Sequence, residues 1–94
     1  MYLISYDITD NRIRGENAKA LSGYGQRVQY SVFECRITEQ QYGELRQKLV
    51  KLMQEEEEGN IRLYNICGKC EQKLSIIGIE KKEIAQEREE LIII

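Results

Sequence analysis

The chain has 94 residues and contains neither histidine nor proline. The absence of imidazole excludes Ser-His-Asp triads, Cys-His dyads and His-ligated metal centres. The formal net charge is −2, but residues 1–54 hold eight Lys or Arg against six Asp or Glu, whereas residues 55–94 hold six against ten. The mean charge therefore hides an uneven surface and does not exclude a nucleic-acid partner.

A chain of this length is expected to form one domain. No apolar run approaches the roughly 18–20 residues of a membrane span, and no secretory signal is visible. The three cysteines are an odd number without the dense spacing of a disulfide framework. These features predict a cytoplasmic protein that has no membrane partner.

The N-terminal third of the chain reads as a strand followed by a helix. Residues 2–8 alternate between apolar and more polar positions, which predicts a β-strand with Asp7 near its carboxyl end. Asp10 or Thr9 can then cap a helix over residues 11–23, because a short side-chain oxygen accepts the free amides of a first turn.

The middle of the chain predicts further strands and a second helix. Residues 27–37 are rich in β-forming residues, and their alternation changes face near Ser31, which indicates a bulge or two short strands. Thr38 and Gln41 form a capping box, and apolar residues at helical spacing predict a helix over 39–54. Strands are expected at 61–67 and 74–79, with a turn at Gly68.

This order predicts an α+β fold, a ferredoxin-like βαββαβ sandwich with an extra C-terminal strand. Residues 1–79 form the domain, including the strand at 74–79. Residues 80–94 form a charged tail that ends in Leu91-Ile-Ile-Ile94. An exposed sheet face and an apolar tail end are both liabilities in water, so we expect a homodimer in which the tail docks on a partner subunit.

Asp7 is the first candidate for chemistry, because the chain has only two Asp residues and the other, Asp10, is favoured as the helix cap. A carboxylate is a hard oxygen ligand for Mg²⁺ or Mn²⁺, and a two-fold axis would supply a second copy. The alternative is a helix cap or a solvated loop acid. Three arginines are candidates to bind phosphate beside it, because guanidinium groups suit phosphate oxygens: Arg12, Arg14 and Arg27. The alternative is that they are solvated surface charges.

The segment Cys67-Gly-Lys-Cys70 has the spacing of a redox motif or a zinc half-site. Zinc needs four ligands, and Cys35 would bring the total to only three. As a redox motif the segment lacks an expected helix N-terminus that would lower a thiol pKa. The interpretation favoured by the sequence is a buried strand end followed by a turn.

Two segments carry a family resemblance: Tyr6-Asp-Ile-Thr-Asp10 with the arginines that follow it, and Tyr24-Gly-Gln-Arg-Val-Gln-Tyr-Ser-Val-Phe-Glu-Cys35. Together they resemble the CRISPR-associated protein 2 family. The resemblance implies the ferredoxin-like fold and a homodimer in which the last strand joins the other subunit's sheet. It also implies antiviral CRISPR adaptation, in which the dimer bridges the integrase, CRISPR-associated protein 1, and binds spacer-precursor DNA.

The same resemblance implies a Mg²⁺-dependent endonuclease on RNA or double-stranded DNA. Asp7 is then the catalytic and metal-binding residue, paired with its copy across the dimer axis. The implied nucleic-acid contacts are Tyr6, Arg12, Arg14, Arg27, Ser31 and Phe33. Glu16 stands where some members have a second arginine, which weakens the basic rim.

Two other functions are compatible with these residues. The first is a non-catalytic scaffold for nucleic acid and integrase, in which Asp7 is structural; we favour it as the physiological role and treat cleavage as secondary. The second is a small ferredoxin-like regulatory domain, which would make the long match around residues 24–35 a coincidence.

Overall fold

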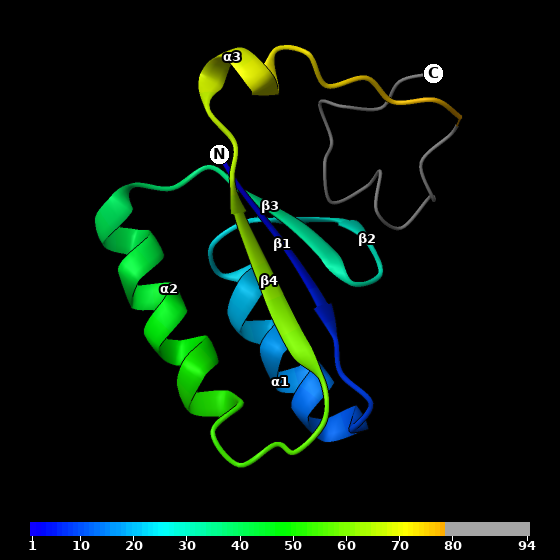
Figure 1. Cartoon of the computed structure of the whole chain (residues 1–94), viewed down its shortest axis with the longest axis vertical. Helices are drawn as coiled ribbons and strands as arrows, with labels where there is room; N and C mark the ends of the chain where they lie inside the picture. The colour runs from blue at the N-terminus through cyan, green and yellow to red at the C-terminus, as the bar shows by residue number, and fades with distance from the viewer. Residues whose placement is uncertain (79–94) are drawn as a thin grey trace.

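The computed structural model describes residues 1–78 and shows one four-stranded antiparallel sheet with two long helices on one face (Figure 1). The elements follow in the order β1 (Tyr2–Asp7), α1 (Asn11–Ser22), β2 (Gln26–Gln29), β3 (Val32–Cys35), α2 (Glu39–Leu52), β4 (Asn60–Asn65) and α3 (Gly68–Glu71). The strand order β2-β3-β1-β4 is that of a ferredoxin-like βαββαβ fold. The predicted fold class is confirmed.

The two predicted helix caps are present. The Asp10 carboxylate accepts a hydrogen bond from the Ile13 backbone N–H at 2.9 Å, so Asp10 and not Thr9 caps α1. At the start of α2 the Thr38 hydroxyl accepts from the Gln41 N–H at 3.1 Å while the Gln41 side chain accepts from the Thr38 N–H at 2.9 Å. Each pair satisfies amides that would otherwise lack a partner.

The predicted break near Ser31 is a two-strand hairpin. β2 and β3 are joined through Tyr30 and Ser31, and their pairing shifts register between Arg27 and Gln29. β3 pairs on its other side with β1, placing Phe33 opposite Ile4.

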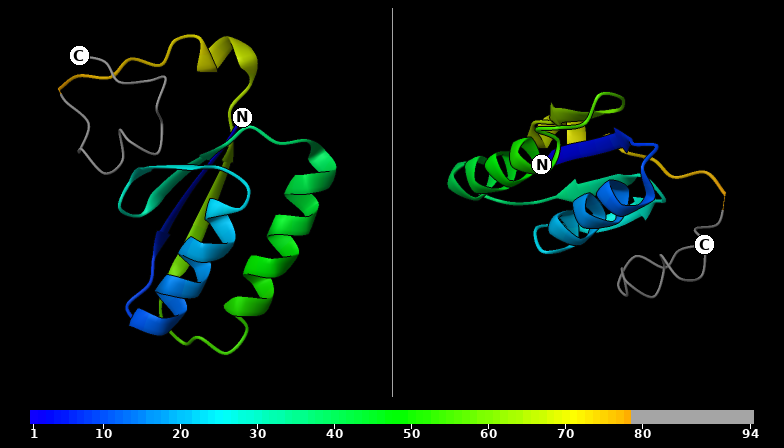
Figure 2. Two further views of the ribbon diagram at one scale, coloured as in Figure 1. Left: turned by 180° about the vertical axis from the view of Figure 1, so that it is seen from behind. Right: turned by 90° about the horizontal axis from the view of Figure 1, so that it is seen from below.

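The core lies between the sheet and the helices, as the view from below shows (Figure 2). Alternate β1 residues point into it, and α2 contributes Leu45 and Leu49. The rings of Tyr2 and Tyr42 stack there with centroids 4.0 Å apart. Within residues 1–78 the other face of the sheet carries no helix, so side chains on that side of β1 and β4 are at least partly exposed.

The C-terminal part of the described chain differs from the prediction. Gly68 begins the one-turn helix α3, and residues 74–78 form no strand within the single chain, so the strand predicted at 74–79 stays a prediction for the dimer. A strand needs a hydrogen-bonding neighbour, and α3 carries the chain past the end of the sheet (Figure 1). The predicted tail at 80–94 lies outside the described residues. No helix within residues 1–78 is long and apolar enough to cross a membrane.

Candidate functional site around Asp7

Asp7 lies at the carboxyl end of β1 on the face of the sheet that the helices leave uncovered. It is exposed, while its neighbours in the chain, Tyr6 and Ile8, are buried. Within residues 1–78 the Asp7 carboxylate has no hydrogen bond or ion pair, whereas Asp10 is engaged as a cap. Among the two aspartates, Asp7 is therefore the one whose oxygens are available to a ligand.

The register of the sheet brings two β4 residues beside Asp7. Asn60 is the direct cross-strand partner of Asp7, and Arg62 is the partner of Ser5 two residues earlier. Side chains of paired residues point to the same face about 5 Å apart, and diagonal neighbours lie about 7–8 Å apart. An amide and a guanidinium thus share the uncovered face with the Asp7 carboxylate.

These two residues were missed by the sequence analysis. The alternation of residues 61–67 predicts a strand, but it does not say which strand pairs with it or in which register. The pairing of β4 with β1 decides this, because it sets Asn60 opposite Asp7.

Gly59, just before β4, lets the turn approach Asp7 closely. Its φ of +100° is one that L side chains rarely adopt, and a Cβ there would lie 2.7 Å from the carbonyl oxygen of Asp7. A residue with a side chain would have to push the end of β1 or the turn aside. Gly59 therefore holds Asn60 and Asp7 in register.

Arg14 fastens the loop that follows Asp7. Its guanidinium donates hydrogen bonds to the carbonyl oxygens of Ile8 at 3.0 Å and Thr9 at 3.3 Å, and to the side-chain oxygen of Asn11. These donors are occupied within the chain, so Arg14 orders the loop leading from Asp7 into α1. A phosphate at this position would compete with backbone carbonyls for the same N–H groups.

The positive charge of Arg12 is largely offset by the acidic residue Glu16. Its Nη1 lies 3.1 Å from the Glu16 carboxylate, one turn later on α1, and 72% of its side chain is exposed. An ion pair this exposed contributes little stability. Glu16 nevertheless reduces the positive field of the rim predicted beside Asp7.

Arg27, Tyr6 and Phe33 lie on the helix side of the sheet and not beside the Asp7 carboxylate. Arg27 is opposite Phe33 in the β2–β3 pair, and its guanidinium carbon lies 5.4 Å from the centroid of the Phe33 ring. The grouping of Arg27 with Asp7 expected from the sequence is therefore not present in the single chain.

Phe33 and Tyr6, for which nucleic-acid contacts were predicted, are buried in the single chain. Phe33 is 1% exposed and Tyr6 is 6% exposed, with the Tyr6 hydroxyl donating to the Tyr30 carbonyl at 3.0 Å. Alternation along each strand puts both rings into the core, so neither reaches a polymer outside. Ser31 lies at the hairpin tip near the Asp7 end, where its carbonyl accepts from the Tyr6 N–H at 3.0 Å.

One chain supplies one carboxylate to a metal at this site. Within the described part of the chain, no cluster of three or more His, Cys, Asp or Glu residues is arranged to hold a metal ion. Mg²⁺ needs only one or two protein carboxylates because water and phosphate complete its shell. An exposed Asp7 with Asn60 beside it fits such a cation when a second copy adds its own carboxylate.

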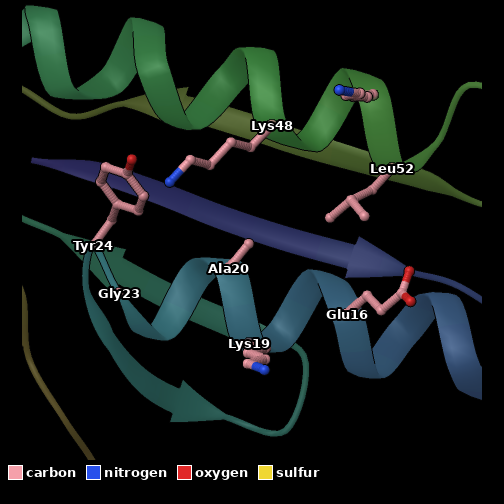
Figure 3. Close-up of a pocket in the computed structure, with 8 residues that line it drawn as sticks. Glu16, Lys19, Ala20, Gly23, Tyr24, Lys48 and Leu52 are labelled. Carbon is pink, nitrogen blue, oxygen red and sulfur yellow. The ribbon is translucent and has the colours of Figure 1, made fainter.

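A separate groove of about 710 Å³ lies between α1 and α2, on the helix side (Figure 3). The Lys48 ammonium stands 4.9 Å from the ring centroid of Tyr24, and hydrogen bonding to Tyr24 raises the Lys48 pKa. Lys19 and Lys51 also line the groove, so it is basic, although Glu16 lies at one end. The sequence analysis did not identify it, because it forms only where the two helices pack.

Comparisons with known proteins agree with this architecture. A family model described as CRISPR associated protein Cas2 matches residues 1–74. A CRISPR-associated endoribonuclease Cas2 from Chloroflexus aurantiacus is 49% identical over 77 residues, which cover 82% of this chain and 83% of the relative.

Solved structures are similar as well. Cas2 from Streptococcus pyogenes superposes with a TM-score of 0.71 at 28% identity, covering 82% of this chain and 98% of the other. A chain of a partial Cas6-RT-Cas1–Cas2 complex has a TM-score of 0.71 at 33% identity, covering 81% of this chain and 88% of the other.

Proposed function

The chain belongs to the CRISPR-associated Cas2 family, and from that membership we propose that it acts in CRISPR adaptation, part of antiviral defence, as a homodimer that bridges the Cas1 integrase and binds spacer-precursor DNA. The family assignment predicted from the sequence is confirmed. Curated relatives are named endoribonucleases or endonucleases, which supports an accompanying nuclease activity. The solved complex that contains Cas1 and Cas2 supports Cas1 as the partner. The three free cysteines of this chain fit a reducing cytoplasm.

The proposed dimer covers the helix-free face of the sheet. Tyr64, on that face, is 46% exposed, and the segment after α3 presents Leu74 at 50%, Ile76 at 49% and Ile77 at 97% exposure. Exposed apolar side chains such as these favour burial against another surface. A second copy that receives the predicted strand 74–79 would supply the hydrogen-bonding neighbour that residues 74–78 lack in one chain.

The nuclease activity is proposed to depend on Asp7. The observation that supports it most directly is that this carboxylate is exposed on the uncovered face without an intrachain partner in residues 1–78. In the dimer, Asp7 and its copy would hold Mg²⁺ or Mn²⁺. The cation, when bound, polarises the phosphoryl oxygen and lowers the pKa of water.

The nucleic-acid contacts are proposed to come from residues around that carboxylate. Arg62 lies on the same face, while Arg12, Arg14 and Ser31 lie at the same end of the sheet. Arg62 is free of the carbonyl contacts that occupy Arg14 and of the carboxylate that neutralises Arg12. It is therefore a stronger candidate for phosphate binding than Arg12 or Arg14.

The deciding experiment compares Asp7→Asn with Asp10→Asn in a nuclease assay on RNA and duplex DNA, with Mg²⁺ or with EDTA. Both variants remove one negative charge, and asparagine caps a helix as well as aspartate does. We expect Asp7→Asn to abolish Mg²⁺-dependent cleavage while the dimer persists in gel filtration. Asp10→Asn should cleave like the wild type. Equal cleavage by all three proteins would overturn the catalytic assignment.

The second candidate is a scaffold without chemistry, in which Asp7 is structural. The Glu16–Arg12 pair favours it, because an arginine that is paired with a carboxylate attracts phosphate more weakly. Here a spacer-acquisition assay in cells separates the two functions. Acquisition that survives Asp7→Asn but is lost when the chain is truncated after Glu80 supports the scaffold; loss with Asp7→Asn supports catalysis.

A further inference from the structure

Cys67 and Cys70 are both exposed at the point where the chain leaves the sheet. This corrects the expectation of a buried strand end. Cys67 lies two residues after the end of β4 and occupies the N-cap position of α3, and Cys70 lies within that single turn. The third cysteine, Cys35, is 0% exposed in the core. The chain thus presents two accessible thiols three residues apart and keeps the third enclosed.

The turn places the two thiols on the same side. The Glu71 N–H donates to the Cys67 carbonyl at 2.9 Å, which closes one helical turn around the pair. Residues three apart in such a turn have Cβ atoms about 5–6 Å apart, whereas a disulfide needs about 3.5–4.5 Å. A small tightening of the turn is enough to bring the sulfurs into bonding distance.

The turn is held at both ends. Before it, the Met1 and Ile66 backbones exchange hydrogen bonds at 2.7 and 2.9 Å, extending the β1–β4 ladder to the residue before Cys67. After it, the Arg36 Nε lies 2.6 Å from the Glu71 carboxylate, tying the end of α3 to the residue that follows β3. Anchors on both sides keep the two cysteines close together.

The surroundings make the two thiols unequal. The Cys67 sulfur has no capping hydrogen bond of ordinary geometry, yet the nearby Cys70 backbone amide, followed by the Cys70 thiol, lowers the pKa of Cys67. The Cys67 thiol in turn raises the pKa of Cys70. Burial raises the pKa of Cys35 to about 11. Cys67 is therefore the most readily ionised, and hence the most reactive, of the three thiols.

We propose that Cys67 and Cys70 form a reversible dithiol–disulfide pair that exchanges with low-molecular-weight disulfides. The Cys67 thiolate attacks one sulfur of such a disulfide, which breaks its S–S bond, forms a mixed disulfide and releases one thiol. The Cys70 thiolate then attacks the Cys67 sulfur and releases the second thiol. The two cysteines together lose two protons and two electrons, and the small disulfide takes up both and becomes two thiols.

The pair sits where its oxidation changes the exit of the chain from the domain. α3 lies between β4 and the apolar segment of residues 74–77, which carries Leu74, Ile76 and Ile77. Tightening the turn alters the direction of that segment relative to the sheet. The redox state thus acts on the segment that, under the proposed function, reaches the second subunit, although the exchange chemistry itself does not depend on that function.

The experiment incubates the full chain with oxidised glutathione at neutral pH in EDTA, then with dithiothreitol, and follows intact mass and thiol content. Cys35→Ala serves as the background in which only the pair remains. We expect the mass of that protein to fall by two hydrogens and both free thiols to disappear, with no disulfide between chains. Peptide mapping should place the bond between Cys67 and Cys70, and dithiothreitol should restore both thiols.

Single variants test the order of the two steps. Cys70→Ser should stop at one glutathione on Cys67, and Cys67→Ser should react more slowly at Cys70. The proposal is overturned if the wild type stops at stable glutathione adducts, forms chain-to-chain disulfides instead, or remains fully reduced. It is equally overturned if the pair is isolated with stoichiometric bound zinc that blocks oxidation.

Discussion

Replacement of Gly59 by alanine tests the contact that holds the turn before β4 against Asp7. The new Cβ would lie 2.7 Å from the Asp7 carbonyl oxygen and 3.3 Å from the Ile8 Cα, on a backbone with φ +100°. The positive φ costs about 1–2 kcal/mol for an L residue, and relieving the overlap costs about 1–3 kcal/mol. We therefore expect the free energy of unfolding to fall by about 2–5 kcal/mol, a large share of a small domain's total.

Urea unfolding followed by circular dichroism measures this loss, with Gly43→Ala as the control. Gly43 lies inside α2, and a Cβ there meets nothing within 4 Å, so alanine should stabilise the protein by about 0.5–1 kcal/mol. Replacing glycine by alanine should then lower the free energy of unfolding at position 59 and raise it at position 43. A Gly59→Ala protein within about 0.5 kcal/mol of the wild type would refute the idea that this turn requires glycine.

Two further substitutions address the loop and the core. Arg14→Ala should lower the unfolding free energy by about 1–2 kcal/mol, because it removes hydrogen bonds to the loop after Asp7, while Arg12→Ala should stay within about 0.5 kcal/mol; equal losses in urea unfolding would contradict the distinction. For Cys35, burial and then the Glu34 charge raise the thiol pKa from 9.0 to about 11. The unfolded thiol ionises first, so the unfolding free energy should fall on the order of 2–3 kcal/mol between about pH 9 and pH 11. Urea unfolding of Cys35→Ala should lack that part of the decline, and an unchanged pH profile would count against it.

The fold was largely predictable because its signals are local. Strict alternation in residues 2–8, the capping box at Thr38 and Gln41, and helical spacing after it each point to one kind of element. Residues 74–78 of the strand predicted at 74–79 form no strand in the single chain, for a reason that is not local. Its residues favour a strand, but pairing depends on a neighbour that one chain does not supply.

The site was predictable only in part. Asp7 was identified by its scarcity and its place at a strand end, and the structure leaves its carboxylate exposed. The arginines show what a residue type alone does not reveal. Arg14 is occupied by the carbonyls of Ile8 and Thr9, while Arg62, which lies beside Asp7, is 55 residues away in the chain.

The sequence by itself determined the family, the order of strands and helices from β1 to β4, and the aspartate at the end of the first strand. These depend on local spacing and on residue types that short-range physics interprets directly. The tertiary structure alone decided which face of the sheet each side chain occupies. The pairing of β4 with β1 sets Asn60 and Arg62 beside Asp7, and α3 exposes Cys67 and Cys70. Both outcomes depend on contacts between distant segments, because strand register and the path of the chain past the sheet are long-range properties.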